Sequence, residues 1–265
     1  MKGEHPRRLR DLLCQAWQVA QQKGIKYLVR AAATVMMYRV RSKIIMSGNS
    51  IVFAVCAVLR RMFCKTFTFR GDTYRYFYHR YNTTWRNERS VEIPIIYRFV
   101  KERDEAAVLE VGNVLSHYFP VRHDIVDKHE HSPRVINQDI VDFHPRKKYD
   151  LIVSISTLEH VGWDELYAGW DKGPRDPTKA LRAIENLKEL LAQKGIMVVT
   201  FPIGYNPYLD RLLRDGKIPL TTLFCLKRIS KDNEWKEVSW SDVSDARFGS
   251  PFPNANGLII GIFRK

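Results

Sequence analysis

Two short runs of sequence, VLEVG at residues 108–112 and YDLIVSISTLEH at residues 149–160, decide the expected fold. Each run is rich in Val, Leu or Ile and lacks alternation of polar and apolar residues, which is typical of a strand covered on both faces. Two further strand-like runs lie between them, IVD at 125–127 and VINQD at 135–139, and each delivers an Asp. Because the carboxyl ends of parallel strands meet at one edge of a sheet, the sequence predicts a ligand crevice lined by these acids, a glycine and a histidine.

The chain continues this pattern beyond residue 160. Asp176 and Pro177 offer an N-cap and a first-turn proline, an apolar stripe at helical spacing follows, and Gly195 is expected to end the helix. Residues 196–201 predict another buried strand, and alternation of strands and helices gives a parallel sheet. Residues 223–229 and 258–263, with 234–239 as a more ambiguous segment, predict strands at an antiparallel edge. The expected core is an α/β domain spanning 106–265.

The composition fits a packed protein in a reducing compartment. Apolar residues make up 45% of the chain, which is enough to build a core. The four cysteines form no C-x-x-C pair and no metal-ligand spacing, so we expect idle or buried thiols and no metal site. The first apolar residues lie among Arg7, Arg8 and Arg10 and form no secretory core. The sequence therefore predicts a cytoplasmic protein.

The net charge of +14 is unevenly distributed. Residues 1–103 contain 21 Lys or Arg and 6 Asp or Glu, a surplus of 15, whereas residues 104–265 contain 22 and 23, a balance of minus one. The basic character therefore belongs to the N-terminal part, and the expected crevice domain is neutral. A neutral crevice argues against a long polyanionic substrate, so nucleic acid is not the expected partner.

Residues 1–65 are expected to form a basic helical extension, for which three interpretations remain open. No Asp or Glu occurs from Leu12 to Gly71, and the uncharged stretch 44–59 is shorter than the roughly 20 residues that a spanning helix needs. The segment could lie on an anionic membrane surface, pack as a buried helical hairpin, or act as a targeting peptide. The first interpretation makes the protein membrane-associated as well as cytoplasmic.

Residues 66–105 are expected to form an aromatic and polar segment on the substrate side. The run FTFRGDTYRYFYHRYNTTWRNER at 67–89 mixes rings with arginines and amides, which suits stacking on a ligand ring together with hydrogen bonding. The alternative is a packing segment whose arginine heads reach water. The candidate substrate-binding residues are Tyr81, Asn82, Trp85 and Arg89.

Taken in order, the motifs at 108–201 resemble the class I S-adenosylmethionine-dependent methyltransferases. The first strand-like run ends in EVGN at 110–113, acids follow the second and third runs, and the fourth run leads into LEHV at 158–161. A helix and a strand ending VTFP at 199–202 complete the likeness. The resemblance implies an α/β, Rossmann-like methyltransferase core with a mostly parallel sheet, here joined to the N-terminal helical extension.

The resemblance also implies a cofactor, S-adenosylmethionine, and roles for individual residues. Asp127, with Asp124 as the alternative, would grip the ribose hydroxyls, and Asp139 would lie near the adenine amine. Gly112 would let the backbone approach the ligand without a Cβ clash. The expected cofactor-binding residues are Glu110, Gly112, Asn113, Asp127, Asp139, Ile140, Ser154 and Ser156.

The family's first turn has two or three glycines, whereas this chain keeps only Gly112. Asn113 tolerates a left-handed backbone better than most residues, so we expect it to substitute for a second glycine. His160 follows the fourth strand and is the candidate catalytic base, because histidine titrates near neutrality. The alternative is that His160 only anchors the turn.

The expected reaction is methyl transfer to an oxygen, with nitrogen as the alternative, of a small-molecule or glycan-like acceptor. Two other functions remain open. One is a non-catalytic adaptor that keeps the methyltransferase fold, and the other is an RNA-modifying methyltransferase whose affinity would fall steeply with salt.

Overall fold

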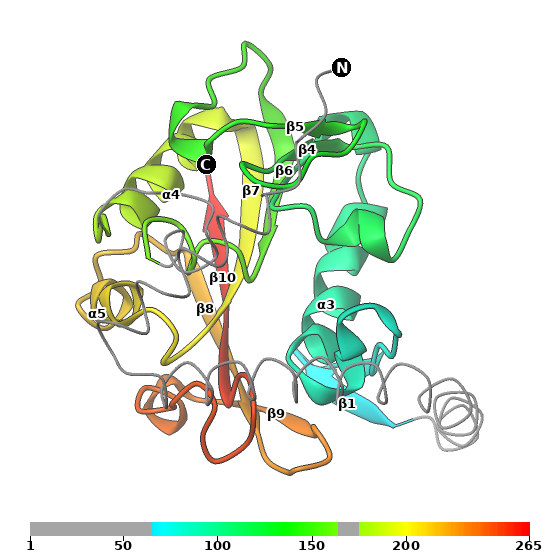
Figure 1. The fold of residues 1–265 in the computed structure, drawn as a ribbon, viewed down its shortest axis with the longest axis vertical. Helices are drawn as coiled ribbons and strands as arrows, with labels where there is room; N and C mark the ends of the chain where they lie inside the picture. The colour runs from blue at the N-terminus through cyan, green and yellow to red at the C-terminus, as the bar shows by residue number, and fades with distance from the viewer. Residues whose placement is uncertain (1–64, 164–174) are drawn as a thin grey trace, which may run out of the picture. The chain divides into compact units, whose positions relative to one another are not determined.

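The computed structural model describes residues 65–163 and 175–265 (Figure 1). Within the described part, the chain folds around an eight-stranded sheet with the order β5-β4-β3-β6-β7-β10-β8-β9. The predicted basic extension, including its membrane-surface interpretation, lies outside the described residues. None of the helices in the described part is both long and apolar enough to cross a bilayer.

The sheet is parallel from β5 to β7 and antiparallel beyond β7. This confirms the predicted mostly parallel, Rossmann-like core with an antiparallel edge, including the ambiguous strand at 234–239. The strands are β3 (Val108–Val111), β4 (Asp124–Val126), β5 (Val135–Ile136), β6 (Tyr149–Ile155), β7 (Leu191–Pro202), β8 (Thr222–Arg228), β9 (Trp235–Val238) and β10 (Gly257–Arg264).

The strand order reverses between β3 and β6. From β3 the chain moves outward to β4 and β5, then returns to place β6 and β7 on the other side of β3. Val111 pairs with both Val126 and Ser154, so the ends of three parallel strands lie level at this point. In an open α/β sheet such a switch point is where ligands bind.

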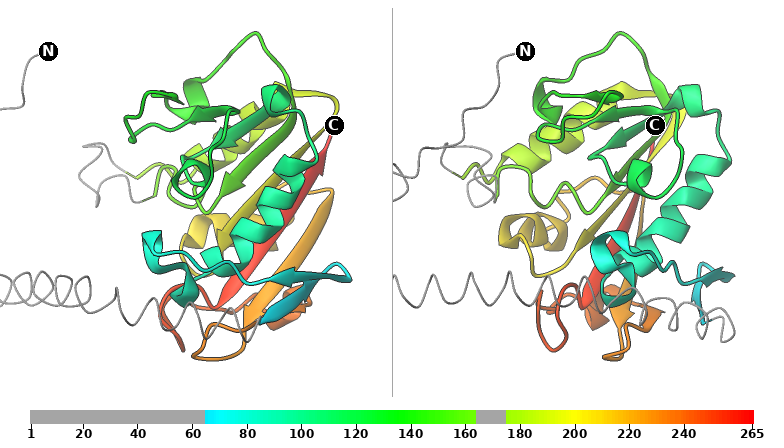
Figure 2. Two further views of the ribbon diagram at one scale, coloured as in Figure 1. Left: turned by 90° about the vertical axis from the view of Figure 1, so that its right-hand side faces the viewer. Right: turned by 45° about the vertical axis from the view of Figure 1, so that its right-hand side comes forward.

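Both faces of the sheet are covered, which explains why its central strands lack alternation. Figures 1 and 2 show α3 (Arg89–Lys101) on one side of the sheet, and α4 (Lys179–Leu190) and α5 (Pro207–Arg214) on the other. Alternate residues of one strand join opposite cores: Ile152 packs with α4 and α5, whereas Leu151 and Val153 pack with α3.

The aromatic segment forms a hairpin of β1 (Thr66–Phe69) and β2 (Asp72–Arg75), the 3-10 helix η1 (Tyr81–Arg86) and then α3. Pro94 lies inside α3, where it cannot donate to the carbonyl of Ser90. That carbonyl instead accepts the N–H of Phe77 at 2.8 Å. The proline therefore leaves an acceptor that fastens the aromatic segment to the helix.

The bounds of α4 differ from the prediction at both ends. The helix begins at Lys179, because the Asp176 carboxylate caps the turn before it by accepting the Thr178 N–H at 3.0 Å. It ends at Leu190, so the prediction that Gly195 ends the helix was wrong. Leu191 already pairs with Tyr149 of β6, and sheet pairing replaces the expected last turn of helix.

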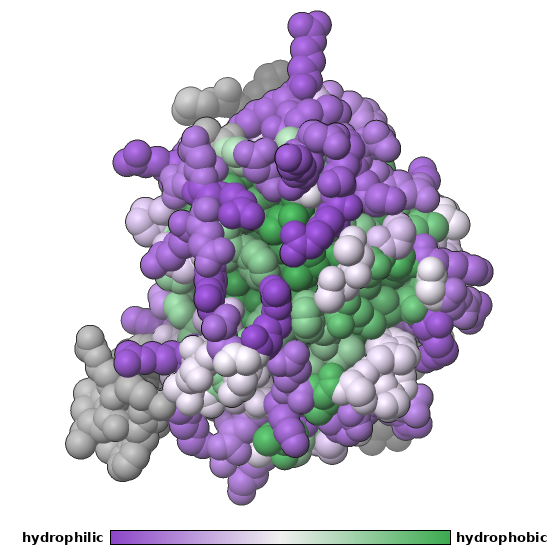
Figure 3. Space-filling view, turned by 180° about the vertical axis from the view of Figure 1, so that it is seen from behind, coloured by the Kyte–Doolittle hydropathy of each residue, from purple (hydrophilic) through white to green (hydrophobic). Residues whose placement is uncertain are grey.

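The remaining 3-10 turns are η2 (Glu105–Ala107), η3 (Leu115–His117), η4 (Ile140–Asp142) and η5 (Trp240–Asp242). The face seen from behind carries apolar side chains in its centre with hydrophilic ones around them (Figure 3). The boundary between 66–105 and 106–265 stays a prediction. In the structure, side chains of α3 and of the sheet belong to one hydrophobic core.

Candidate functional site

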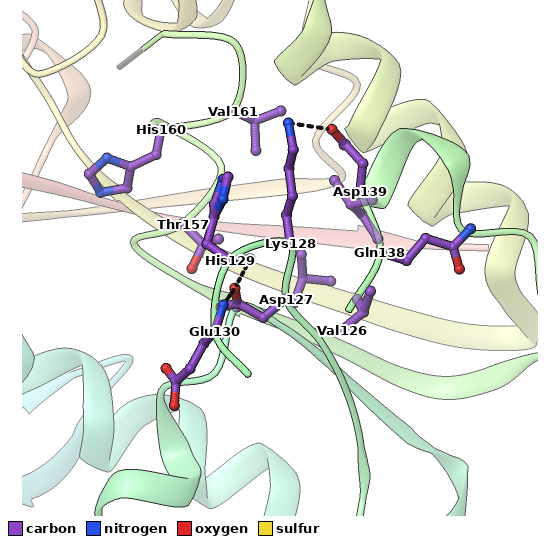
Figure 4. Close-up of a pocket in the computed structure, with 13 residues that line it drawn as sticks. Val126, Asp127, Lys128, His129, Glu130, Gln138, Asp139, Thr157, His160 and Val161 are labelled. Atoms are coloured by element: carbon purple, nitrogen blue, oxygen red, sulfur yellow. Dashed lines mark hydrogen bonds and ion pairs between the residues drawn. The ribbon is translucent and has the colours of Figure 1, made fainter. Parts of the chain in front are cut away.

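A cavity of about 430 Å³ opens at the carboxyl ends of β3, β4 and β6 (Figure 4). This volume lies in the range of pockets that bind small molecules. Its walls come from the turn after β3, the loops after β4 and β5, and the turn after β6. The lining residues are Val111, Gly112, Val126, Asp127, Lys128, His129, Glu130, Gln138, Asp139, Ile140, Thr157, His160 and Val161.

Gly112 forms the floor of the cavity in a left-handed conformation, with φ of +84°. Its N–H donates to the carbonyl of Val126 at 2.9 Å, which joins the ends of β3 and β4. A Cβ at this position would overlap the hydroxyl of Thr157 and lie 2.8 Å from its methyl group. The missing side chain therefore makes room for Thr157, which also lines the cavity.

Asp127 lies at the end of β4 and presents its carboxylate to the cavity. Oδ1 accepts the backbone N–H groups of His129 and Glu130 at 2.8 Å, and Oδ2 accepts that of Asn113 at 2.9 Å. Backbone donors thus fix the orientation of the side chain. Among residues 65–163 and 175–265, Oδ2 has a single donor, so it can accept another hydrogen bond from a ligand hydroxyl.

Glu110 is fully buried, and its oxygens are occupied by the protein itself. Oε1 accepts the N–H groups of Val114 and Leu115 at 3.0 and 2.7 Å, and Oε2 lies 2.7 Å from Nε2 of His123. Glu110 does not line the cavity. Glu110 therefore stabilises the turn after β3 by accepting backbone N–H groups of that turn.

Asn113 also lies behind the cavity wall. Its amide nitrogen donates to Oε1 of Glu130 at 2.6 Å, and its side-chain oxygen accepts the hydroxyl of Ser116. The expectation that Asn113 replaces a second glycine was wrong, because its φ is not positive. In this turn only Gly112 has a left-handed backbone. Asn113 has a negative φ, and its backbone N–H donates to Asp127.

Asp139 stands opposite His160 in the cavity, beside Lys128 (Figure 4), and Lys179 also contacts it. Its Oδ2 lies 2.7 Å from Nζ of Lys179 and 3.1 Å from Nζ of Lys128. Burial opposes ionisation of Asp139, but the hydrogen bonds from these two lysines outweigh it and lower the pKa of the carboxyl. Ile140 follows Asp139 and adds, with Val126 and Val161, an apolar wall.

A buried ion pair from α3 supports the turn after β6. Oε2 of Glu92 lies 2.6 Å from Nη1 of Arg89, and Oε1 accepts the hydroxyls of Ser156 and Thr200, each at 2.6 Å. Burial would lower the pKa of the Arg89 guanidinium, but Glu92, Glu88 and Glu159 outweigh it and raise that pKa. The guanidinium is therefore a permanent charge inside this network.

Ser156 has a φ of +38°, which is unusual for a residue with a side chain. Four contacts keep it there, because its N–H reaches the carbonyl and hydroxyl of Thr200 at 3.0 and 3.2 Å, its hydroxyl reaches Glu92, and its carbonyl accepts Nη2 of Arg89 at 3.4 Å. Strained residues that surrounding contacts hold in place occur at functional sites. This turn delivers Thr157 and His160 to the cavity.

Sequence reasoning included Ser156 and Arg89 among the site residues but not Glu92, which joins them. Ser156 serves the turn and does not line the cavity, and Ser154 donates to the carbonyl of Val111 at 3.3 Å, which links β6 to β3. Its spacing of three residues from Arg89 is a common ion-pair pattern on helices and does not mark a site. Its two hydroxyl partners, Ser156 and Thr200, lie 64 and 108 positions further along the chain. Only the docking of α3 brings them together.

None of the four predicted substrate-side residues lines the cavity. Tyr81 is 48% exposed, and its ring stacks on that of His117 with a centroid distance of 4.3 Å. His117 lies 3.1 Å from Oε2 of Glu130, which does line the cavity. Asn82 has a φ of +53°, and its side chain is exposed. Trp85 is half-buried. Tyr81 thus connects to the cavity wall through two side chains.

His160 lies at the cavity edge, 39% exposed, with the ring of Tyr205 edge-on at 4.8 Å. Glu159 beside it is buried, and burial raises the pKa of this carboxyl to about 7, although the charges of His160 and Arg89 oppose the shift. In the part of the chain that the structure describes, no cluster of three or more His, Cys, Asp or Glu could hold a metal ion.

The raised pKa of Glu159 predicts a pH dependence of stability. Folding retains a proton that the unfolded chain releases near the ordinary value of 4.5, so this contribution is complete below that pH and is lost as the pH rises through about 7. Glu159→Gln should therefore unfold at about the same denaturant concentration as wild type near pH 5 but be more stable near pH 8.5, by up to about 3 kcal/mol. Equal differences at both pH values, measured by urea unfolding, would contradict this.

A scan against protein-family models and a search of curated proteins find nothing that matches the chain. Among solved structures, the chain is similar to the N-methyltransferase NodS of Bradyrhizobium japonicum in complex with S-adenosyl-L-homocysteine, with 15% identity, a TM-score of 0.40, and coverage of 67% of this chain and 87% of that one. An rRNA methylase of Streptococcus thermophilus gives 10% identity, a TM-score of 0.37, and coverage of 65% and 96%.

Magnesium protoporphyrin IX methyltransferase of Synechocystis with bound S-adenosylmethionine gives 12% identity, a TM-score of 0.33, and coverage of 63% and 76%. All three proteins are named as methylating enzymes, and two of the names give an acceptor, rRNA in one and magnesium protoporphyrin IX in the other. The case for a function therefore rests on the residues of the cavity.

Proposed function

We propose that this chain is an S-adenosylmethionine-dependent methyltransferase that acts on an oxygen, or alternatively a nitrogen, of a small-molecule or glycan-like acceptor. One observation carries the proposal: the Asp127 carboxylate stands inside a cavity at the switch point of the sheet, beside a glycine turn. A carboxylate at a strand end accepts ribose hydroxyls in doubly wound folds.

The other cavity residues fit an adenosyl group. Val126, Ile140 and Val161 offer apolar surface to a purine, and Gly112 lines the cavity without a side chain of its own. Asp139 fits its expected role less well than Asp127, since two lysines already share its Oδ2. We infer that the carboxylate of Asp127 is the main polar contact for the cofactor, and that Asp139 positions Lys128 and Lys179.

When bound, the cofactor would supply a methyl group on a sulfonium. The chain's part is to align the acceptor and to receive its proton. His160 is suited to that step, because its ring lies at the cavity edge and reaches both the cavity and water. A positioned histidine typically contributes about 10²–10⁴-fold to such a reaction.

The acceptor is proposed to approach beside the stacked pair of Tyr81 and His117, because exposed rings next to a cavity suit a ligand that carries a ring. Asn82 and Trp85 lie on the same 3-10 helix and would add polar and aromatic contacts. Arg89 is committed to Glu92 and Ser156, so its proposed role changes from direct contact to support of the turn after β6.

Titration calorimetry with S-adenosylmethionine and S-adenosylhomocysteine tests the function. We expect 1:1 binding to the wild type and a loss of at least about tenfold in affinity, or about 1.4 kcal/mol, for Asp127→Asn. Asp124→Asn is the matched control, because Asp124 starts the same strand but bonds Lys147 and Tyr149 at 2.7 and 3.0 Å, outside the cavity.

The control variant should bind as the wild type does. Absence of binding to the wild type would contradict the proposal and favour a non-catalytic adaptor. Equal affinities of wild type and Asp127→Asn would remove the assigned role of Asp127.

A further inference from the structure

Glu159 combines three properties that its neighbours do not share. Its side chain is only 2% exposed, its Oε2 has no hydrogen-bond partner among the described residues, and its Oε1 lies 3.9 Å from Nε2 of His160. Most buried polar side-chain atoms have a hydrogen-bond partner, so a buried carboxyl oxygen without one calls for an explanation.

We propose that Glu159 is a positioning residue for His160: its carboxylate stabilises the imidazolium that forms when His160 takes the proton of the methyl acceptor. This inference rests on the proposed methyltransferase function and extends it. It implies an acceptor that must lose a proton, such as a hydroxyl group.

The turn that carries Glu159 is fixed in place. The side-chain amide of Asn206 donates to the carbonyl of Glu159 at 2.9 Å, and the same Asn206 caps α5 by accepting the N–H groups of Tyr208 and Leu209 at 3.0 and 3.2 Å. Asn206 is itself buried. The helix therefore holds the Glu159–His160 pair at a set position beside β6, as a positioning role requires.

The charges that face Glu159 come from two elements. His160 on the same turn and Arg89 on α3 favour the ionised carboxyl, whereas Glu92 on α3 disfavours it. Burial is the largest influence and raises the pKa of Glu159 to about 7, so a proton on His160 and the charge on Glu159 are linked near neutral pH. The separation of 3.9 Å exceeds a hydrogen bond but allows a strong charge interaction inside the protein.

The step balances as follows. The acceptor's nucleophilic atom bonds to the methyl carbon as the bond between that carbon and sulfur breaks, with its electron pair staying on sulfur. The acceptor's proton moves to the unprotonated ring nitrogen of neutral His160, and the negative charge of Glu159 compensates the positive charge that arises. Because His160 is 39% exposed, the proton can then pass to water, which restores the neutral ring.

The test follows the Cε1–H resonance of His160 by NMR as a function of pH, with the signal assigned from its absence in His160→Gln. In Glu159→Gln the midpoint should move to lower pH by about half a unit or more, because the neutral amide no longer favours imidazolium. Glu185→Gln, at an exposed position of α4, is the control and should leave the midpoint unchanged. An unchanged midpoint in Glu159→Gln overturns the proposal, since a merely structural role would alter stability alone.

The reciprocal measurement does not require Glu159 to be replaced. With ¹³C-labelled glutamate, the Glu159 carboxyl resonance should titrate at higher pH in His160→Gln than in wild type, because a favourable charge is lost. His160 is partly exposed, so its replacement leaves the core intact. An unmoved Glu159 midpoint overturns the proposal even if Glu159→Gln does not fold. Neither titration needs the cofactor, so failure here is distinct from failure to bind S-adenosylmethionine.

Discussion

Gly112→Ala is expected to lower the affinity for S-adenosylmethionine at least about tenfold and the free energy of unfolding by about 2–3 kcal/mol. Two causes add. Alanine is strained at a φ of +84°, and its Cβ would overlap the Thr157 side chain, which lies across the cavity floor. Thr157 is tied to the carbonyl of Ile155 at 3.1 Å, so its displacement disturbs the turn that carries His160. Calorimetry and urea unfolding measure the two effects.

Gly71→Ala separates the two causes. Gly71 has a φ of +80°, yet nothing lies within 4 Å of a Cβ there, so its replacement should show backbone strain alone, at about 1 kcal/mol. The double variant Gly112→Ala, Thr157→Ala should recover part of the lost affinity, because the overlap is relieved. If Gly112→Ala costs no more stability than Gly71→Ala, the overlap with Thr157 is not what excludes a side chain.

Glu92→Ala is expected to cause the largest loss of stability, about 3–5 kcal/mol. The variant leaves the Arg89 guanidinium, only 12% exposed, without its carboxylate, and it removes the acceptor that the hydroxyls of Ser156 and Thr200 share. Because Ser156 would lose a contact that holds its positive φ, cofactor affinity should fall as well. Urea unfolding followed by tryptophan fluorescence gives the stability difference.

Glu102→Ala is the matched control. Glu102 also pairs with an arginine, Arg98, at 3.4 Å, but both side chains are about half exposed, and such pairs contribute about 0–1 kcal/mol. Removing both buried charges in Arg89→Met, Glu92→Leu should cost less than the sum of the single changes, since no lone charge remains. A Glu92→Ala variant as stable as Glu102→Ala would mean that the network does not support the fold.

The centre of the sheet could be predicted because β3, β6, β7 and β10 are covered on both faces. Residues such as Ile152 and Val153 face opposite cores, so both must be apolar, and an unbroken apolar run is the result. The crevice could be predicted for a related reason. Parallel strands end at the same edge, so Asp127 and Asp139 reach one cavity although twelve positions separate them.

The roles of the acids could not be separated from the sequence. Glu110 and Asp127 both follow or end apolar runs, but Glu110 points into the buried turn and binds His123, whereas Asp127 points into the cavity. Which face a side chain takes depends on the strand's register in the folded sheet. The sequence favours Asp127 over Asp124 but leaves Asp124 as the alternative, and the contacts of Asp124 with Lys147 and Tyr149 distinguish the two.

The contribution of α3 was beyond sequence reasoning for a different cause. The aromatic segment has a composition typical of a ligand surface, yet much of it packs: Phe77 donates its N–H to α3, and Arg89 is buried against Glu92. Local pattern places Arg89 and Glu92 one turn apart on α3, but it does not encode the burial of this pair or the bond between Phe77 and Ser90. The end of α4 shows the same limit, because pairing of Leu191 with Tyr149 overrides the glycine that would otherwise end the helix.

A crystal structure of the protein with S-adenosylhomocysteine tests the central claim most directly. We expect ligand density in the cavity at the ends of β3, β4 and β6, with the ribose hydroxyls at the Asp127 carboxylate and the purine against Ile140. Density for the ligand at another place on the protein, or a cavity that stays free of it at saturating concentration, would contradict the account.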